Sequence, residues 1–291
     1  MKESDLDALT YSIVDLFEKD DYSTSEVFHE STKITRRNYA ELSRRSDFIQ
    51  RDPNLVLMMS RAYKTYAGHE KLALPRASLG DMTLEDALRR RRSHVGKYTG
   101  EPITLEQLGA TLRYSYGPTF AVESRMFPGE KIHYRSAASA GALYPLEIYP
   151  LVFNVTGCEP GIYHYNVLEH SFDVLRRTSP LDDFLKLTTY YDLSRTSAAM
   201  LVITAVMPRT IAKYLFRGYR FVSYDVGVLL QNLYLTTTAQ ELGACAVGGF
   251  FDDEVGKLIG TDNVDEVVTM LFSIGRLPPN SAPVKHAASN A

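Results

Sequence analysis

The chain has 291 residues, of which 45% are hydrophobic and 23% charged, and its formal net charge is −3. This is the composition of a folded globular protein long enough for one large domain, and a charge near zero offers no argument for a nucleic-acid partner. The two cysteines lie far apart without metal-ligand spacing, and no apolar run reaches the roughly 20 residues of a membrane span. We therefore expect a cytoplasmic protein without a structural metal, a nucleic-acid partner or a membrane partner.

Residues 1–80 are expected to form a helical N-terminal extension. Apolar residues recur at helical spacing from Leu6 to Phe17, and Pro75 is expected to end the extension. His29 and Glu30 stand side by side in a polar connector, residues 29–33. They admit a catalytic pair, although an adjacent His-Glu is more often found at a surface or a helix cap.

Two helix starts follow, each marked by a threonine and acidic residues or a glutamine in the first turn: Thr83 and Thr104. The first of these helices runs into a basic stretch that contains Arg91, Arg92 and Ser93. Arginine forks and a hydroxyl match phosphate oxygens, whereas a basic run at a helix end is more commonly solvated. The segment is thus either a phosphate clamp or an ordinary helix end.

The middle of the chain predicts strands and one small-residue segment. Small side chains at 135–142 allow a close approach of the backbone to a ligand, or else a tight turn. Residues 162–166 and 171–175 alternate about a polar turn and predict a hairpin, and the apolar run 198–206 predicts a central strand. Strands and helices interleave without strict alternation, which indicates an α+β protein.

The stretch from Lys213 to Arg220 places a lysine beside a tyrosine, followed by further cationic and phenolic groups. It leads into an apolar run, 221–235, with apolar residues on every face, which predicts a helix buried all round. Proton-transfer groups at the mouth of a buried helix indicate a reaction centre. The alternative is a set of solvated charges and packing tyrosines.

Taken together, these motifs resemble the SagB-type azoline dehydrogenases, a branch of the nitroreductase-like flavoproteins. The resemblance runs from about Leu84 to Arg276, and a His-Glu-x-Thr-Lys segment like residues 29–33 commonly precedes the domain in that family. The markers, in chain order, are Arg91-Arg92-Ser93, Ser139-Ala140-Gly141-Ala142-Leu143-Tyr144-Pro145, Gly161-Ile162-Tyr163-His164-Tyr165, Lys213-Tyr214, Arg217-Gly218-Tyr219-Arg220, Gln231-Asn232 and Gly248-Gly249-Phe250.

The resemblance implies a nitroreductase-like α+β fold, with a central mixed sheet flanked by helices, that forms a homodimer with FMN at its interface. We expect a helical extension at 1–80, the FMN-binding oxidase domain at 81–277 and a loose tail at 278–291. The implied reaction is oxidation of a peptide thiazoline or oxazoline to the thiazole or oxazole, with dioxygen reoxidising FMN.

The substrate implied by the resemblance is a ribosomal precursor peptide or a peptide tethered to the carrier domain of a nonribosomal peptide synthetase. Members of that family work inside synthetase or cyclodehydratase complexes, so the resemblance also implies such a complex as a partner. The rival interpretations are an NAD(P)H-dependent nitro- or quinone reductase on the same fold and a scaffold subunit.

Carried over by position, the family's FMN-binding residues correspond to Arg91, Arg92, Ser93, Ser139, Gly141, Gly248, Gly249 and Arg276. Its catalytic pair corresponds to Lys213 and Tyr214. Either Tyr214 as a phenolate or Lys213 as a neutral amine can serve as the base that removes the ring proton. The superfamily usually has a cation two residues after the serine, where this chain has Val95, and Lys97 is the candidate replacement. Val228 stands where a histidine often follows Gly227.

Overall fold

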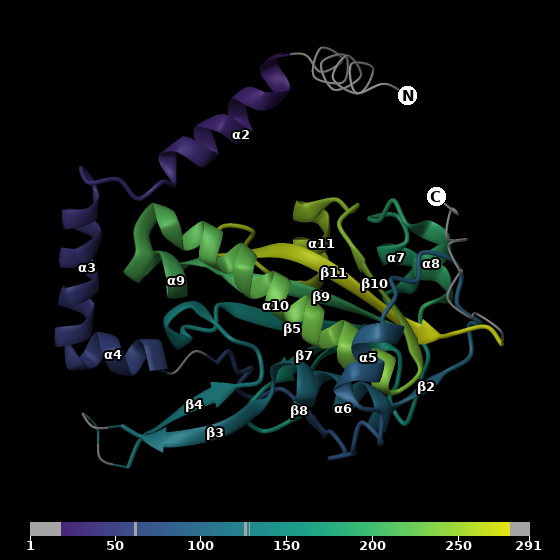
Figure 1. Cartoon of the computed structure of the whole chain (residues 1–291). Coiled ribbons are helices and arrows are strands. Elements are labelled where there is room, and N and C mark those ends of the chain that lie inside the picture. Colours follow the sequence, from purple (N-terminus) through teal and green to yellow (C-terminus); the bar gives the residue numbers. More distant parts are fainter. Residues whose placement is uncertain (1–18, 61–62, 125–126, 128, 280–291) are drawn as a thin grey trace.

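The computed structural model describes residues 19–60, 63–124, 127 and 129–279 (Figure 1). The helix expected near the N-terminus, from Leu6 to Phe17, lies outside these residues, as does the expected tail from 280 onward. Within the described residues, no helix combines the length and the apolar character needed to cross a membrane.

A seven-stranded sheet organises the molecule, in the order β1-β8-β7-β5-β9-β11-β10. Its strands are β1 (Lys71–Ala73), β5 (Leu146–Val152), β7 (Gly161–Asn166), β8 (Ser171–Arg176), β9 (Ala199–Val206), β10 (Leu242–Val247) and β11 (Glu266–Arg276). Every ladder in this sheet is antiparallel, so the prediction of a mixed sheet is wrong. The reason is that β11 lies between β9 and β10 and pairs antiparallel with both, so β9 and β10, which the α9–α10 crossover joins, are not neighbours.

The remaining elements are two small sheets and the helices. One sheet pairs β2 (Ile103–Thr104) with β6 (Val155–Thr156), and the other is a hairpin of β3 (Pro118–Glu123) and β4 (Lys131–Arg135). The helices are α2 (Lys19–Ser31), α3 (Tyr39–Arg51), α4 (Pro53–Ser60), α5 (Leu84–Arg90), α6 (Leu105–Tyr116), α7 (Leu181–Phe184), α8 (Tyr191–Thr196), α9 (Met207–Tyr214), α10 (Gly218–Ala239) and α11 (Asp252–Ile259), with short 3₁₀ turns η1 (Ala140–Ala142) and η2 (Leu215–Arg217).

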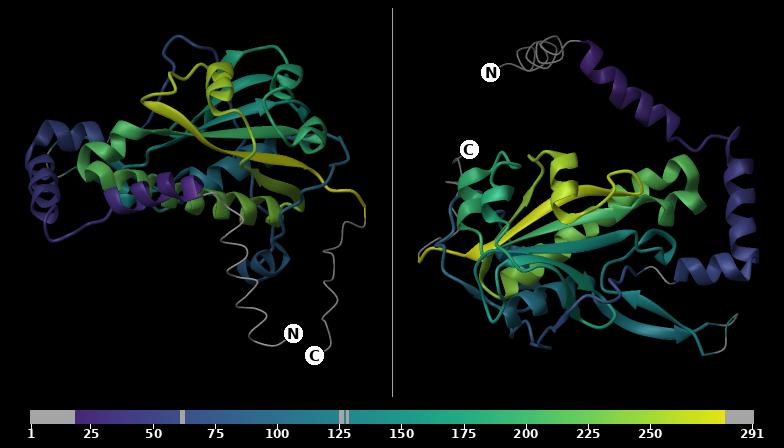
Figure 2. Two further views of the ribbon diagram at one scale, coloured as in Figure 1. Left: turned by 90° about the horizontal axis from the view of Figure 1, so that it is seen from above. Right: turned by 180° about the vertical axis from the view of Figure 1, so that it is seen from behind.

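Helices cover both faces of the sheet. Helices α5, α6 and α10 lie on one face, and α7, α8 and α11 on the other (Figure 2). The central strand β9 shows why both layers are needed: Leu201 and Ile203 point into the core beneath α6 and α10, while Met200 and Val202 point into the core beneath α7, α8 and α11. Successive residues of a strand face opposite sides, so an apolar run without alternation requires cover on both.

Several local predictions are confirmed. The Thr83 hydroxyl caps α5 by accepting from Asp86 N (3.1 Å), and Thr104 forms a capping box with Gln107 at the start of α6. The predicted hairpin is β7–β8, and the predicted central strand is β9. These features depend on short-range sequence, which is why they could be predicted.

The N-terminal helices α2, α3 and α4 extend along one side of the body (Figures 1 and 2). The chain then returns to the sheet and supplies its edge strand β1, which pairs with β8. Residues 71–73, predicted to belong to the extension, are therefore part of the main sheet. We call helices α2 to α4 the N-terminal arm. Its middle helix, α3, contacts the body, because Arg45 Nε donates to Ala212 O near the end of α9 (2.9 Å).

Helix α10 crosses one face of the sheet. The sequence predicted that this helix is buried on every face, and that prediction is wrong. A buried stripe, which includes Val222, Leu229 and Leu233, packs on the sheet. Opposite it runs an exposed stripe formed by Tyr219, Ser223, Tyr224, Gly227 and Gln231. Aromatic residues and glycine on this stripe produced the false appearance of a fully buried helix.

Candidate functional site

The segment after α5 lies against β10, the outer strand of the sheet. The guanidinium carbon of Arg91 is 5.3 Å from the centre of the Tyr234 ring of α10. Ser93 Oγ donates to Tyr234 Oη (3.0 Å), which in turn accepts from Ala246 N of β10 (2.7 Å). A cation and a hydroxyl thus meet at a strand edge, which is a donor set suited to an anionic ligand.

The other two predicted arginines are turned differently. Arg92 is exposed, and its guanidinium donates to carbonyls of its own helix end, Arg89 O and Arg91 O. Arg276 closes β11 opposite Leu242, and its Nε and Nη2 both donate to Pro102 O (3.2 and 3.1 Å). Arg276 therefore stands at the Leu242 end of β10, beyond the Arg91–Ser93 segment.

Lys97, the candidate to replace the cation that is missing at Val95, forms an ion pair with Asp192. Val95 is 70% exposed, and the Lys97 Nζ lies 3.4 Å from an oxygen of Asp192 on α8. Lys97 is thus already neutralised by a surface ion pair.

Gly248 and Gly249 follow β10 at the end away from Leu242, about 20 Å along the strand. A Cβ added to Gly248 would meet no atom within 4 Å, so the backbone there is open to a ligand. A Cβ on Gly249 would collide with the hydroxyl of Thr189, whose backbone N donates to Gly249 O (2.9 Å). Of the two predicted glycines, Gly248 faces free space and Gly249 packs against a neighbouring loop.

Lys213 and Tyr214, at the end of α9, converge on the small-residue segment. Gly141 has a φ of +63°, and a Cβ on it would lie 2.5 Å from Tyr214 Oη and 3.2 Å from Lys213 Nζ. The Lys213 Nζ is 5.3 Å from the centre of the Tyr214 ring. The chain therefore brings three predicted site residues, separated by about 70 positions in sequence, into one place that only glycine fits.

We call the end of α9, the start of α10 and the Gly141 segment beside them the α9–α10 corner. Ser139 is held at this corner by Asp225, a residue that the sequence analysis did not identify. Its hydroxyl donates to Asp225 Oδ2 (2.5 Å), and Ala140 N donates to Asp225 Oδ1 (3.2 Å). The Ser139 oxygen also accepts from Tyr144 N (2.9 Å). Asp225 is 6% exposed on α10. Its signal in the sequence was a carboxylate that interrupts an apolar helix, which indicates a buried polar role.

Burial sets the protonation of this corner. It lowers the pKa of Lys213 below its ordinary value and raises the pKa of Tyr214, an effect that the nearby Asp225 carboxylate strengthens. Burial also raises the pKa of Asp225, against the hydrogen bonds from Ser139 and Ala140. Among the described residues Lys213 makes no ion pair that would restore its charge. Each shift disfavours a charged form, so the Lys213 amine loses its proton more readily, and the Tyr214 phenol less readily, than the same group at the surface.

A cavity of about 400 Å³ lies between α9 and the start of α10 on one side and the start of α11 and the α11–β11 connection on the other. Beside it, residues 266–270 of β11 pair with β9 alone, because β10 ends opposite Leu271. Apolar and polar side chains, among them two aspartates, line the cavity: Met207, Ile211, Tyr219, Asp252, Asp253, Asn263, Val264, Val267 and Val268.

The predicted FMN-binding residues along β10, namely Arg91, Ser93 and Gly248, form what we call the β10 edge. This edge and the α9–α10 corner lie apart on one chain. Asp225 and Tyr234, which mark them on α10, are nine residues apart, which is about 14 Å along the helix and half a turn around it. The two groups of predicted residues therefore face different directions within a single chain.

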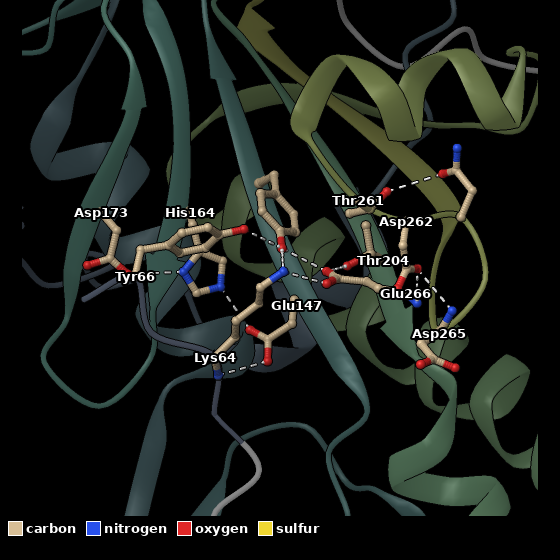
Figure 3. Close-up of polar contacts among 12 residues, drawn as sticks. Lys64, Tyr66, Glu147, His164, Asp173, Thr204, Thr261, Asp262, Asp265 and Glu266 are labelled. Atoms are coloured by element: carbon tan, nitrogen blue, oxygen red, sulfur yellow. Dashed lines mark hydrogen bonds and ion pairs between the residues drawn. The ribbon is translucent and has the colours of Figure 1, made fainter. Parts of the chain in front are cut away.

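A further polar cluster lies inside the sheet (Figure 3). Glu266, 7% exposed, accepts hydrogen bonds from Lys64 Nζ (2.6 Å) and from the hydroxyls of Tyr149 and Thr204 (both 2.7 Å). Glu147, 1% exposed, accepts from Arg209 of α9 (2.6 Å). We call this set, with the residues of the next paragraph, the sheet network.

The sheet network continues through a buried histidine. His164 Nε2 lies 3.0 Å from Glu147, and its Nδ1 lies 3.2 Å from Asp173. Burial opposes the charge on Glu147, but Arg209 and His164 outweigh it and lower the pKa of Glu147 to about 2. Paired charges of this kind are typical of structural networks.

Comparison with known proteins gives the family. The model of the nitroreductase family matches residues 88–276. A protein of Methanocaldococcus jannaschii described as a nitroreductase is 33% identical over 196 residues, which is 67% of this chain and 92% of that protein. The trifolitoxin-processing protein TfxB of Rhizobium leguminosarum bv. trifolii is 27% identical over 135 residues, which is 45% of this chain and 36% of that protein.

Solved structures share the fold. A structure from Anabaena variabilis described as a nitroreductase has a TM-score of 0.62 and 26% identity, and it matches 74% of this chain but only 44% of its own length. A chain of the Escherichia coli microcin synthetase McbBCD complex with truncated pro-MccB17 bound has a TM-score of 0.53 at 17% identity, covering 85% of this chain and 99% of that one.

Proposed function

The chain belongs to the nitroreductase family, and from that premise we propose that it is an FMN-dependent oxidase of peptide azolines. It would convert a thiazoline or oxazoline in a peptide into the thiazole or oxazole. The observation that carries this proposal is the corner where Lys213 and Tyr214 meet Gly141, because it brings together an amine whose pKa is lowered by burial and a phenol hydroxyl. The likeness to a trifolitoxin-processing protein favours a peptide substrate, either a ribosomal precursor or a carrier-bound chain.

Members of the family typically bind FMN, and the residues along β10 fit such a ligand. Arg91 and Ser93 would hold the phosphate, with Arg276 farther along the strand and Arg92 exposed beside it. Gly248 would present its backbone to the ring system, since nothing occupies the space above it. When bound, FMN supplies the hydride acceptor that azoline oxidation requires, and dioxygen is its proposed oxidant.

Lys213 is the proposed base. Aromatisation removes a proton from the ring carbon next to the peptide carbonyl and a hydride from the adjacent ring carbon. The carbonyl and the C=N bond acidify that proton, so a modest, well-placed base is sufficient. A neutral Lys213 amine can accept it, whereas the raised pKa of Tyr214 disfavours a phenolate and leaves its hydroxyl as a hydrogen-bond donor that orients the ring.

A homodimer would complete the site. The exposed stripe of α10, which carries Tyr219 and Tyr224, is the proposed interface. Since the β10 edge and the corner face different directions on one chain, we propose that each FMN contacts the β10 edge of one chain and the corner of its partner.

The test is an anaerobic titration of the purified, FMN-loaded protein. A peptidyl thiazoline should bleach the flavin absorbance and yield a product lighter by two hydrogens, whereas NADPH should not bleach it. Bleaching by NADPH alone would instead assign the chain to the reductases of the family. A protein that neither reagent reduces, but that binds a cyclodehydratase or synthetase, would be a scaffold.

A further inference from the structure

The end of the first described helix, α2, is fastened to the start of α10. Arg220 Nη2 donates to His29 O (2.6 Å), and Arg220 Nε donates to the Thr32 hydroxyl (2.7 Å). Arg217 Nη1 donates to Thr32 O (3.1 Å). The two arginines of one sequence motif thus bind the His-Glu-x-Thr-Lys segment of another, more than 180 positions away.

These contacts form a built interface. Thr32 is only 5% exposed, although it stands in an otherwise exposed segment. Beside it, the rings of Phe28 and Tyr219 pack edge to face with centroids 5.2 Å apart. The last carbonyls of a helix lack partners within the helix and carry its negative dipole end, so the Arg220 guanidinium both caps and neutralises the end of α2. His29 and Glu30 contribute backbone and surface contacts here, and Glu30 pairs with Lys33.

We call these contacts the clasp; they attach the N-terminal arm to the chain just after Lys213 and Tyr214. Directly after them, Leu215 adopts φ 49° and ψ −136°, a conformation that is strained for a residue with a side chain. Arg45 of α3 binds Ala212 O on the other side of the pair. Strained backbone persists only where surrounding contacts hold it, and here the N-terminal arm supplies contacts both before and after the strained residue.

We propose that Arg217 and Arg220 are positioning residues, which clamp residues 28–32 onto the α9–α10 corner and so hold Lys213 and Tyr214 against Gly141. This inference rests on the proposed function for its kinetic part. It also gives the N-terminal arm a role in the chemistry, although no residue of the arm reaches the reacting groups.

Opening the clasp should solvate the corner. Lys213 would lose the burial that disfavours its charged form, and its pKa would rise toward that of an exposed lysine. Of the other titratable groups here, Tyr214 would move with Lys213, because both end α9, whereas Asp225 would stay on α10. The base would then be less available near neutral pH and less well aligned.

Arg220→Ala tests the clasp, with Arg44→Ala as the matched control, because Arg44 is an exposed arginine of the same arm. In full-length, FMN-loaded protein, hydrogen exchange of residues 26–33 and 212–221 should accelerate together in Arg220→Ala alone. The kcat for a peptidyl thiazoline should fall about 10- to 100-fold, the cost of a small misplacement, with KM nearly unchanged. Arg220→Lys, which keeps the charge but loses the fork, should recover part of the loss.

A second readout does not depend on the azoline reaction. The pH midpoint for acylation of Lys213, followed by peptide mass spectrometry, should move upward in Arg220→Ala and, by less, in Thr32→Val. Faster exchange with an unchanged midpoint and unchanged kcat would overturn the proposal and leave the arm a mere tether. If Arg220→Ala fails to fold, Thr32→Val decides, since it replaces only a hydroxyl by a methyl. A wild-type protein inert toward thiazolines would refute the proposed function, while the acylation midpoint would still judge the clasp.

Discussion

The sheet network and the α9–α10 corner both contain ionisable groups inside the protein, but they differ in how those groups are paired. In the network, Glu147 and Glu266 each accept several short hydrogen bonds from cations or hydroxyls (Figure 3). At the corner, Lys213 makes no ion pair among the described residues, and its charged form is disfavoured by burial alone.

This difference distinguishes ionisable groups that stabilise the fold from groups that remain available for proton transfer. Pairing offsets the cost of burying the network and makes its members inert, because each proton is already committed to a partner. An unpaired, half-buried amine keeps its proton-accepting capacity at a pH where a surface lysine is charged. A count of buried titratable groups would therefore indicate the sheet network as the reaction centre, whereas the lysine without an ion pair among the described residues indicates the corner.

The largest expected effect comes from Lys213→Ala. Loss of the base should lower kcat for thiazoline oxidation by about 10² to 10⁴-fold, while FMN content and the urea midpoint of unfolding stay near the wild-type values. In the wild type, the rate should rise with pH through a pKa below 10.5, because the deprotonated amine is the active form. Full activity in the variant, with the pH limb intact, would remove Lys213 from the mechanism.

Glu266→Gln should have the opposite profile. It leaves Lys64 partly buried without its counter-charge and should lower the free energy of unfolding by about 3 kcal/mol, the low end for a broken buried pair, because the Lys64 side chain remains 30% exposed. Activity per folded molecule should be unchanged. Glu169→Gln, which breaks the exposed pair with Lys71, is the control and should leave stability near the wild-type value, because solvent screens exposed ion pairs. Urea unfolding measures both.

Acid should weaken the sheet network through Glu147. Its pKa in the folded protein, about 2, lies below the ordinary 4.5, so its contribution to stability is complete above about pH 4.5 and is lost as the pH falls toward 2. Glu147→Gln should be less stable at pH 7 but should lose stability less steeply over that acid range. Equal slopes in both proteins would show that Glu147 is not paired as described.

Gly141→Ala should change stability less than Glu266→Gln does. An L-residue in the left-handed region costs about 1–2 kcal/mol, which is the whole cost expected for Gly129→Ala, at a φ of +87° with open space around it. Gly141→Ala should cost at least as much, because its methyl would also lie 2.5 Å from Tyr214 Oη. Only Gly141→Ala should also reduce activity, since its methyl would displace Tyr214 Oη and Lys213 Nζ. If both variants lost activity equally, the convergence on Gly141 would have no catalytic meaning.

Local sequence was sufficient for much of the fold. The caps at Thr83 and Thr104, the β7–β8 hairpin and the central strand β9 follow from neighbours within a few positions. The order of the motifs also identified the family that the comparisons establish. The prediction for α10 was wrong in its burial, because a sequence shows how apolar a helix is but not which of its faces meets the sheet.

Only the tertiary structure decided what the motifs do together. It placed Gly141 against Lys213 and Tyr214, added Asp225 to that corner, separated it from the β10 edge, and joined Thr32 to Arg220 across 188 positions. Spacing along a chain fixes the side chains of one turn or one hairpin, since covalent geometry limits their separation. Contacts between distant segments depend on how the helices pack on the sheet. The burial that lowers the pKa of Lys213 results from this packing and cannot be seen in the sequence.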